Sequence, residues 1–160
     1  MSDNPTTPNP THANALVLSG VGIMIRGASG SGKSRLTYAL LEEAGCRPTQ
    51  SAGSKTNADT ALIGDDYITL KAGDQLLASP APNLAGRIEL RGIGILGLPW
   101  RDQAPIHLLV DLLPVGDVER LPETRKITVS GHQLDHVAVP IGDLAHQMLL
   151  VRTAVALLSC

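Results

Sequence analysis

The spacing of apolar and polar residues along the first third of the chain predicts two strands and a helix. Apolar runs at residues 15–19 and 21–26 flank Gly20 and predict two strands joined by a tight turn. Beyond residue 32 the apolar residues recur every three or four positions, which predicts a helix over about residues 33–44. The residues with this spacing are Leu36, Ala39, Leu40 and Leu41, and Gly45 ends the pattern.

The remaining pattern predicts further short strands and a closing helix. Residues 47–60 are polar and contain Pro48 and Gly53, so we expect an exposed, mobile loop, which we place at residues 46–60. The strands are predicted at 61–64, 67–71, 75–78, 87–90, 105–113, 126–129 and 133–139, and the closing helix at 141–158. Together these elements indicate an α/β domain with a mixed, largely antiparallel sheet.

Length and composition limit what this chain can be. Its 160 residues and 16.8 kDa fit one domain, which we place at residues 11–160 after a polar, proline-rich and disordered lead-in at 1–10. A net charge of −2 with few aromatic residues argues against nucleic acid as a partner, and no stretch approaches the roughly 20 apolar residues that span a membrane. Cys46 and Cys160 lack metal-ligand spacing, so we expect a soluble, cytoplasmic protein with reduced thiols.

The segment between the second strand and the first helix is a complete phosphate-binding loop. It reads Gly27-Ala28-Ser29-Gly30-Ser31-Gly32-Lys33-Ser34. Its glycines allow backbone N–H groups to surround phosphate oxygens, Lys33 can reach the β- and γ-phosphates, and the Ser34 hydroxyl can coordinate Mg²⁺. This predicts binding of a nucleoside triphosphate or a related polyphosphate; the alternative is an ordinary glycine-rich turn before a helix.

Two predicted strands end in aspartate, and either could serve a metal ion at this loop. One strand runs into the pair Asp65-Asp66, and the other contains Asp111. By hydropathy Asp111 matches the ordinary metal-binding strand better. The pair, however, can divide its work between a metal ligand and a general base, because a cation lowers the pKa of the nearer carboxylate. A turn with no catalytic role remains the alternative for Asp65-Asp66.

Several motifs in this order resemble the catalytic domain of bacterial HPr kinase/phosphorylase. The resemblance spans about residues 11–125 in order and approximate spacing. It rests on His12, which lies 15 positions before the phosphate loop, on the loop itself, and on Asp65-Asp66. It rests as well on Glu89-Leu90-Arg91-Gly92-Ile93-Gly94-Ile95, which is similar to the family signature Glu-x-Arg-Gly-x-Gly-Ile, and on Glu119-Arg120-Leu121.

The resemblance implies a fold and a reaction. The fold would be that of HPr kinase and PEP carboxykinase. The reaction would be phosphorylation of a serine on a small HPr-type phosphocarrier protein of the phosphotransferase system, with ATP or pyrophosphate as donor, and phosphorolysis in reverse. The chain would be a short form of the family without its N-terminal domain.

The resemblance also implies roles for individual residues. Lys33 and Ser34 would bind phosphates and Mg²⁺, and Asp65 and Glu89 would help to hold the metal. Asp66 would be the general base in phosphorylation and the general acid in phosphorolysis. His12 would lie beside Asp66 and the transferred phosphoryl group, and Arg120 against phosphate.

Other readings stay open where the match is poor. Residues 46–60 are longer than the usual link of the family, and residues 139–160, where the family contacts its partner and neighbouring subunits, match poorly. The choice of partner and the formation of a homo-oligomer therefore stay open. A small-molecule kinase and a non-catalytic ATP-sensing module are the alternative functions.

Some of the remaining residues of chemical interest have structural interpretations, and for others a functional role stays open. We expect His107 and Asp111 to be structural, and His132 and His136 to bind no metal because a third ligand is missing. The glycines Gly92, Gly94 and Gly97 favour a tight barrel corner or a loop that closes over phosphates. Arg91 could form an ion pair or contact a ligand, and Trp100 is a candidate for an exposed protein-docking edge.

Overall fold

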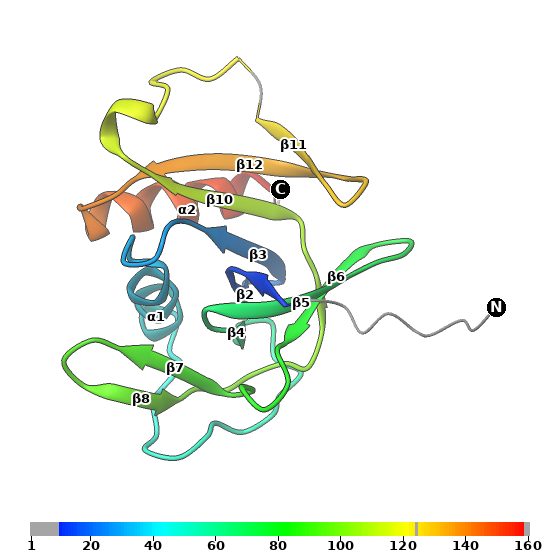
Figure 1. Cartoon of the computed structure of the whole chain (residues 1–160), viewed down its shortest axis with the longest axis vertical. Helices are drawn as coiled ribbons and strands as arrows, with labels where there is room; N and C mark the ends of the chain where they lie inside the picture. Colours follow the sequence, from blue (N-terminus) through cyan, green and yellow to red (C-terminus); the bar gives the residue numbers. More distant parts are fainter. Residues whose placement is uncertain (1–9, 124, 159–160) are drawn as a thin grey trace.

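The computed structural model describes residues 10–123 and 125–158 (Figure 1). Residues 1–9 of the expected lead-in, and Cys160, lie outside the described residues. The helices of the described chain are α1 (Lys33–Glu43), α2 (Leu144–Leu158) and the single 3-10 turn η1 (Val115–Asp117). The strands are β1 (Thr11–His12), β2 (Asn14–Leu18), β3 (Val21–Arg26), β4 (Ala61–Gly64), β5 (Tyr67–Ala72), β6 (Leu76–Pro80), β7 (Arg87–Leu90), β8 (Gly94–Gly97), β9 (Ala104–Pro105), β10 (Leu108–Leu113), β11 (Lys126–Val129) and β12 (His132–Pro140).

The main sheet is mixed, as the pattern predicts. Its strand order is β11-β12-β10-β3-β2-β4. Strand β10 runs parallel to both β12 and β3, whereas β2 runs antiparallel to β3 and β4. The phosphate-loop strand β3 is therefore flanked by β10 on one side and β2 on the other, and both neighbours approach the loop.

Two smaller antiparallel sheets complete the fold within the described residues. One has the order β1-β5-β6-β9, and the other is the hairpin of β7 and β8. The chain leaves the main sheet at the end of β4 and enters the second sheet at β5, so the connecting Asp65-Asp66 turn lies where the two sheets meet. Figure 1 shows α2 behind β10 and β12, with the β7–β8 hairpin beyond α1.

The core forms on both faces of the main sheet because its central strands are apolar on both sides. In β2, Leu16 packs toward the helices while Ala15 and Val17 pack toward the second sheet. Alternate residues of β3 divide in the same way, with Ile23 on the helix side and Met24 on the other. The fold therefore has three layers, which are helices, main sheet and second sheet.

Two element predictions need correction, and the strands β1 and β8 were not predicted. The strand predicted at residues 105–113 is two strands, because β9 pairs with β6 before the chain crosses into β10. The closing helix begins at Leu144 rather than at residue 141, and the short strand β1 was missed. The glycine-interrupted run forms the second strand of the β7–β8 hairpin, and Gly92 and Gly94 take positive φ of 93° and 113° at its turn.

The polar segment 47–60 is mostly exposed, as predicted, but backbone hydrogen bonds fasten it to the rest of the chain. Thr49 exchanges two of them with Gly97, and the Gly53 N–H donates to Gly86. Trp100 donates its indole N–H to the Gly53 carbonyl at 2.9 Å and packs against the helix-side core. The prediction of an exposed docking edge at Trp100 is therefore wrong, and the mobility of the segment stays a prediction.

Candidate active site

The phosphate loop lies between β3 and α1, as the motif requires. Positive φ values of 80° at Gly30 and 100° at Gly32 turn the backbone in a way that favours glycine. At Gly27 a Cβ atom would lie 2.5 Å from the Ser31 hydroxyl, so a side chain there would disturb the loop. Helix α1 starts directly after this turn, and its free N–H groups and dipole favour a bound anion.

Lys33 lies across the loop with only 6% of its surface exposed. Its ammonium donates to the carbonyls of Gly27 at 2.9 Å and Ala28 at 3.3 Å. Burial lowers the pKa of Lys33, although the nearby carboxylates Asp66 and Asp65 act to raise it. A positive charge is thus held where the β- and γ-phosphates of a bound nucleotide would lie.

Asp65 faces the loop and accepts three hydrogen bonds. Its Oδ1 accepts from the Ser34 hydroxyl at 2.5 Å and from the Asn14 amide at 2.9 Å, and its Oδ2 accepts from the Glu89 backbone N–H at 3.0 Å. Hydroxyl and carboxylate oxygens are hard ligands of the kind that Mg²⁺ prefers. Ser34 and Asp65 therefore fit a magnesium ion bound together with phosphates.

Asp66 points away from its neighbour, toward His12. The Oδ1 of Asp66 lies 3.0 Å from the Nε2 of His12, and the two side chains are 57% and 36% exposed. Asp66 has a positive φ of 68°, which is uncommon for a residue with a side chain. His12 reaches it because β1 pairs with β5 and the His12 ring lies 5.3 Å from that of Tyr67.

A surface cavity of about 540 Å³ lies beside the phosphate loop and the aspartate pair. Both aspartates and Glu89 line it, the last from the β7–β8 hairpin. Arg91, which has no ion pair among the described residues, lines it as well. The full lining is Ser29, Gly30, Gly32, Lys33, Ser34, Arg35, Asp65, Asp66, Glu89, Leu90 and Arg91.

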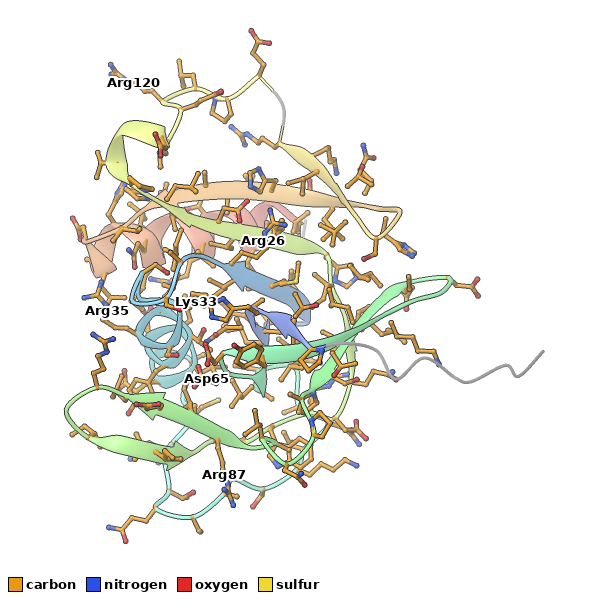
Figure 2. The ribbon with its side chains drawn as sticks, in the orientation of Figure 1. Arg26, Lys33, Arg35, Asp65, Arg87 and Arg120 are labelled. Carbon is orange, nitrogen blue, oxygen red and sulfur yellow. The ribbon has the colours of Figure 1, made fainter. Side chains whose placement is uncertain are left out.

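Two of the proposed catalytic residues, His12 and Arg120, do not line this cavity. His12 contacts the lining residue Asp66 at 3.0 Å, whereas Arg120 lies apart. Arg120 follows η1 and is exposed. Figure 2 shows Arg120 beyond β10 and β12, whereas Lys33 and Asp65 lie together near the centre of the view. Arg120 therefore does not lie beside the cavity of this single chain, and its contact with phosphate stays a prediction.

Asp111 is engaged elsewhere, as its structural interpretation predicts. Both of its oxygens accept from the Arg26 guanidinium, at 2.9 and 3.0 Å, and the Nε2 of His136 lies 2.8 Å from Oδ2. Burial acts to raise the pKa of Asp111, but the hydrogen bonds from Arg26 and His136 outweigh it and keep that pKa below its usual range. A carboxylate neutralised in this way is a poor candidate for the metal.

The other titratable residues form no second centre. No group of three His, Cys, Asp or Glu residues able to hold a metal occurs within 10–123 and 125–158. His107 accepts a long hydrogen bond from the Gly22 N–H, at 3.4 Å. Cys46 is a free thiol, and burial raises its pKa. Neither α1 nor α2 is long and apolar enough to cross a membrane.

Sequence reasoning missed two residues of the site, Asn14 and Arg35. Arg35 lines the cavity one position after the loop motif ends, where an arginine on a helix carries no distinctive signal. Asn14 is fully buried and hydrogen-bonded to both aspartates. An amide at the start of the apolar run Ala15 to Leu18 was the available signal, because a buried polar side chain needs partners.

The fold and the site define a phosphate-loop α/β domain with a paired-carboxylate centre. No family model matches the chain. It is distantly homologous to HPr kinase/phosphorylases, with 26% identity to that of Mycoplasma mycoides subsp. mycoides and 29% to that of Burkholderia cenocepacia. These matches cover 91% and 90% of this chain but 46% and 44% of the relatives, so the chain spans about half the length of the curated proteins it matches.

A solved structure supports the same relation. The Hpr(Ser) kinase/phosphatase from Coxiella burnetii matches with a TM-score of 0.73 and 27% identity, over 92% of this chain and 88% of that one. The mixed α/β architecture is therefore structurally similar to that of an HPr kinase/phosphatase, which agrees with the resemblance stated above.

Proposed function

We propose that this chain catalyses Mg²⁺-dependent phosphorylation of a serine on a small HPr-type phosphocarrier protein, and the reverse phosphorolysis. The observation that carries the proposal is the division within the aspartate pair. Asp65 faces Ser34 and the phosphate loop, while Asp66 faces His12 and the open cavity. A site that only senses ATP has no use for a second carboxylate directed away from the phosphates.

In the forward direction Asp66 accepts the proton of the attacking serine hydroxyl. The serine oxygen forms a bond to the terminal phosphorus as the bond from that phosphorus to the leaving phosphate oxygen breaks. Lys33 and the loop N–H groups balance the negative charge that moves onto the leaving group. His12 keeps the Asp66 carboxylate oriented toward the cavity through their 3.0 Å contact.

Ser34 and Asp65 are the residues that would hold Mg²⁺, with Glu89 lining the same cavity. The ion neutralises phosphate charge when it is bound. The phosphate donor and the acceptor serine would therefore meet between the phosphate loop and the Asp65-Asp66 turn. The base, Asp66, would lie on the side away from the loop.

In the reverse direction inorganic phosphate attacks the phosphoserine and pyrophosphate is the product. Asp66, now protonated, gives its proton to the departing serine oxygen, while Lys33 and the loop amides hold the attacking phosphate. Simple hydrolysis would release orthophosphate instead, so the product distinguishes the two reactions.

The decisive experiment combines both directions. The protein is incubated with Mg²⁺, ATP labelled on the γ-phosphate, and candidate phosphocarriers, and label on a carrier serine is measured. Phosphoserine carrier is then treated with and without inorganic phosphate, and pyrophosphate is measured. Pyrophosphate that requires both carrier and phosphate supports the proposal.

The other outcomes assign the alternatives. Transfer without phosphorolysis would leave a one-way kinase. ATP binding with no transfer in either direction, to any carrier, would favour the ATP-sensing module. Transfer to free serine or another small molecule in preference to carriers would favour the small-molecule kinase.

A further inference from the structure

A fully buried amide connects the two aspartates to the strand beside the phosphate loop. Asn14 is the first residue of β2 and has 0% exposure. Its Nδ2 donates to Asp65 Oδ1 at 2.9 Å and to the Thr37 hydroxyl at 3.0 Å, and its Oδ1 accepts from the Asp66 backbone N–H at 2.9 Å. One side chain thus contacts both members of the pair and helix α1.

We propose that Asn14 is a positioning residue that sets the two aspartates for different tasks. It directs the carboxylate of Asp65 toward Ser34 and holds the backbone of Asp66 in the conformation that turns its carboxylate toward His12. The proposal rests on the transfer reaction above for its kinetic consequences. Its consequence for metal binding is independent of that reaction.

The backbone of Asp66 shows why such a residue is needed. A non-glycine residue at φ of 68° is in a strained region, and such strain persists only where the surroundings hold it. Two hydrogen bonds hold the backbone of Asp66 here. Its N–H donates to the Asn14 side chain, and its carbonyl accepts from the Ala13 N–H at 3.0 Å. Removal of the Asn14 acceptor leaves this turn free to relax.

The contact with Thr37 extends the arrangement to the helix that carries Lys33. Thr37 is buried, donates its hydroxyl to the Lys33 carbonyl at 2.8 Å, and accepts from Asn14. The amide of Asn14 is therefore orientated by a partner outside the aspartate pair. Its donor side faces Asp65 and its acceptor side faces the Asp66 N–H.

The primary test replaces Asn14 with leucine, which is similar in size and cannot form hydrogen bonds. We expect turnover to fall about tenfold to a hundredfold, the range for residues that orient a metal ligand. The Mg²⁺ concentration needed for half-maximal nucleotide binding should rise severalfold. Both effects should be present in protein that is fully folded at the assay temperature.

A double-mutant cycle separates positioning from a general loss of stability. If Asn14 acts through Asp66, Asn14→Leu should have a much smaller effect on turnover in the Asp66→Asn background than in the wild type. The proposal would be overturned if Asn14→Leu reduced turnover by the same factor in both backgrounds, or if the Mg²⁺ requirement were unchanged.

The chain offers a matched control in Gln147, the other fully buried amide of the described residues. Its Nε2 donates to the Pro140 carbonyl at 2.8 Å, and Gln147, which belongs to helix α2, does not line the cavity. Gln147→Leu removes one buried hydrogen bond, and turnover and Mg²⁺ requirement should stay at wild-type values. An equal kinetic loss in this control would show that Asn14→Leu acts only through stability.

A conservative variant keeps the proposal testable if the leucine variant does not fold. Asn14→Thr retains one hydroxyl that can donate or accept but cannot reach both aspartates. It should lie between wild type and leucine, with a raised Mg²⁺ requirement, and wild-type behaviour in both readouts would overturn the proposal. If the wild-type protein transfers phosphate to no carrier, the proposed function fails, and the Mg²⁺ dependence of nucleotide binding still decides the role of Asn14.

Discussion

We expect replacement of Asp66, the proposed general base, by asparagine to separate catalysis from folding at this site. A positioned general base contributes about 10²- to 10⁴-fold in rate. This corresponds to about 3 to 5 kcal/mol of activation free energy. We therefore expect Asp66→Asn to reduce serine phosphorylation by at least about a hundredfold while nucleotide binding stays near normal, because Lys33 and the loop are unchanged.

The structure predicts that the same change costs little stability. Asparagine tolerates the left-handed backbone, so φ of 68° can be kept, and the bonds of the Asp66 N–H and carbonyl do not involve the carboxylate. The lost contact with His12 is between exposed side chains, and such pairs contribute only about 0–1 kcal/mol. The expected loss in unfolding free energy is thus under about 1 kcal/mol, far below the change in the activation barrier.

The assay measures initial rates of carrier phosphorylation at saturating ATP and Mg²⁺, with nucleotide affinity and denaturant unfolding measured on the same preparation. Asp74→Asn is the control, because Asp74 is exposed in the turn between β5 and β6 and the change in charge is identical. Asp65→Asn should instead raise the Mg²⁺ requirement. Wild-type transfer by Asp66→Asn together with no transfer by Asp111→Asn would refute the reasoning and move the centre to the other strand.

Two further predictions concern the loop and the adjacent ion pairs. Lys33→Ala should abolish productive ATP or pyrophosphate binding in a folded protein, and unchanged affinity and transfer rate in a calorimetric titration and rate assay would exclude the phosphate-loop role. Asp111 has a pKa held below its usual range, so its stabilising effect is present above about pH 4, the ordinary pKa of aspartate, and is lost as the pH falls through the lowered value. Asp111→Asn should therefore lower the unfolding free energy by about 2 kcal/mol at neutral pH. The unfolding free energy of the variant should also decrease less than that of the wild type as the pH is lowered. An unchanged decrease, measured by denaturant titration at several acidic pH values, would contradict this.

The pattern of apolar residues was sufficient to predict most of the elements, because the buried central strands consist mainly of apolar residues. The run from Val21 to Arg26 and the helix after the loop were placed within one residue of their observed ends. The single strand predicted at 105–113 was wrong, because the pattern of apolar residues does not show which sheet a strand joins. An apolar run can serve two sheets in succession, and β9 joins β6 while β10 joins β3.

The site was predictable only where a short motif carries it. The phosphate loop is contiguous in the sequence, so its residues can be recognised from the motif alone. His12 and Asp66 are 54 positions apart and meet only because β1 pairs with β5. The resemblance to a known family supplied that pair, and it also supplied Arg120, which this chain keeps apart from the cavity.

The sheet order explains why the carboxylate proposed to hold the metal comes from a turn and not from the neighbouring strand. Strand β10 lies beside β3, and its register pairs Asp111 with Arg26 one residue before the loop, where the guanidinium neutralises it. Asp65 follows β4, which is separated from β3 by β2. A carboxylate two strands away can meet Ser34 only across the end of β2, and Asn14 is the residue at that end. A buried amide there allows the chain to hold a charge beside the loop without neutralising it, which an arginine in the same place would not.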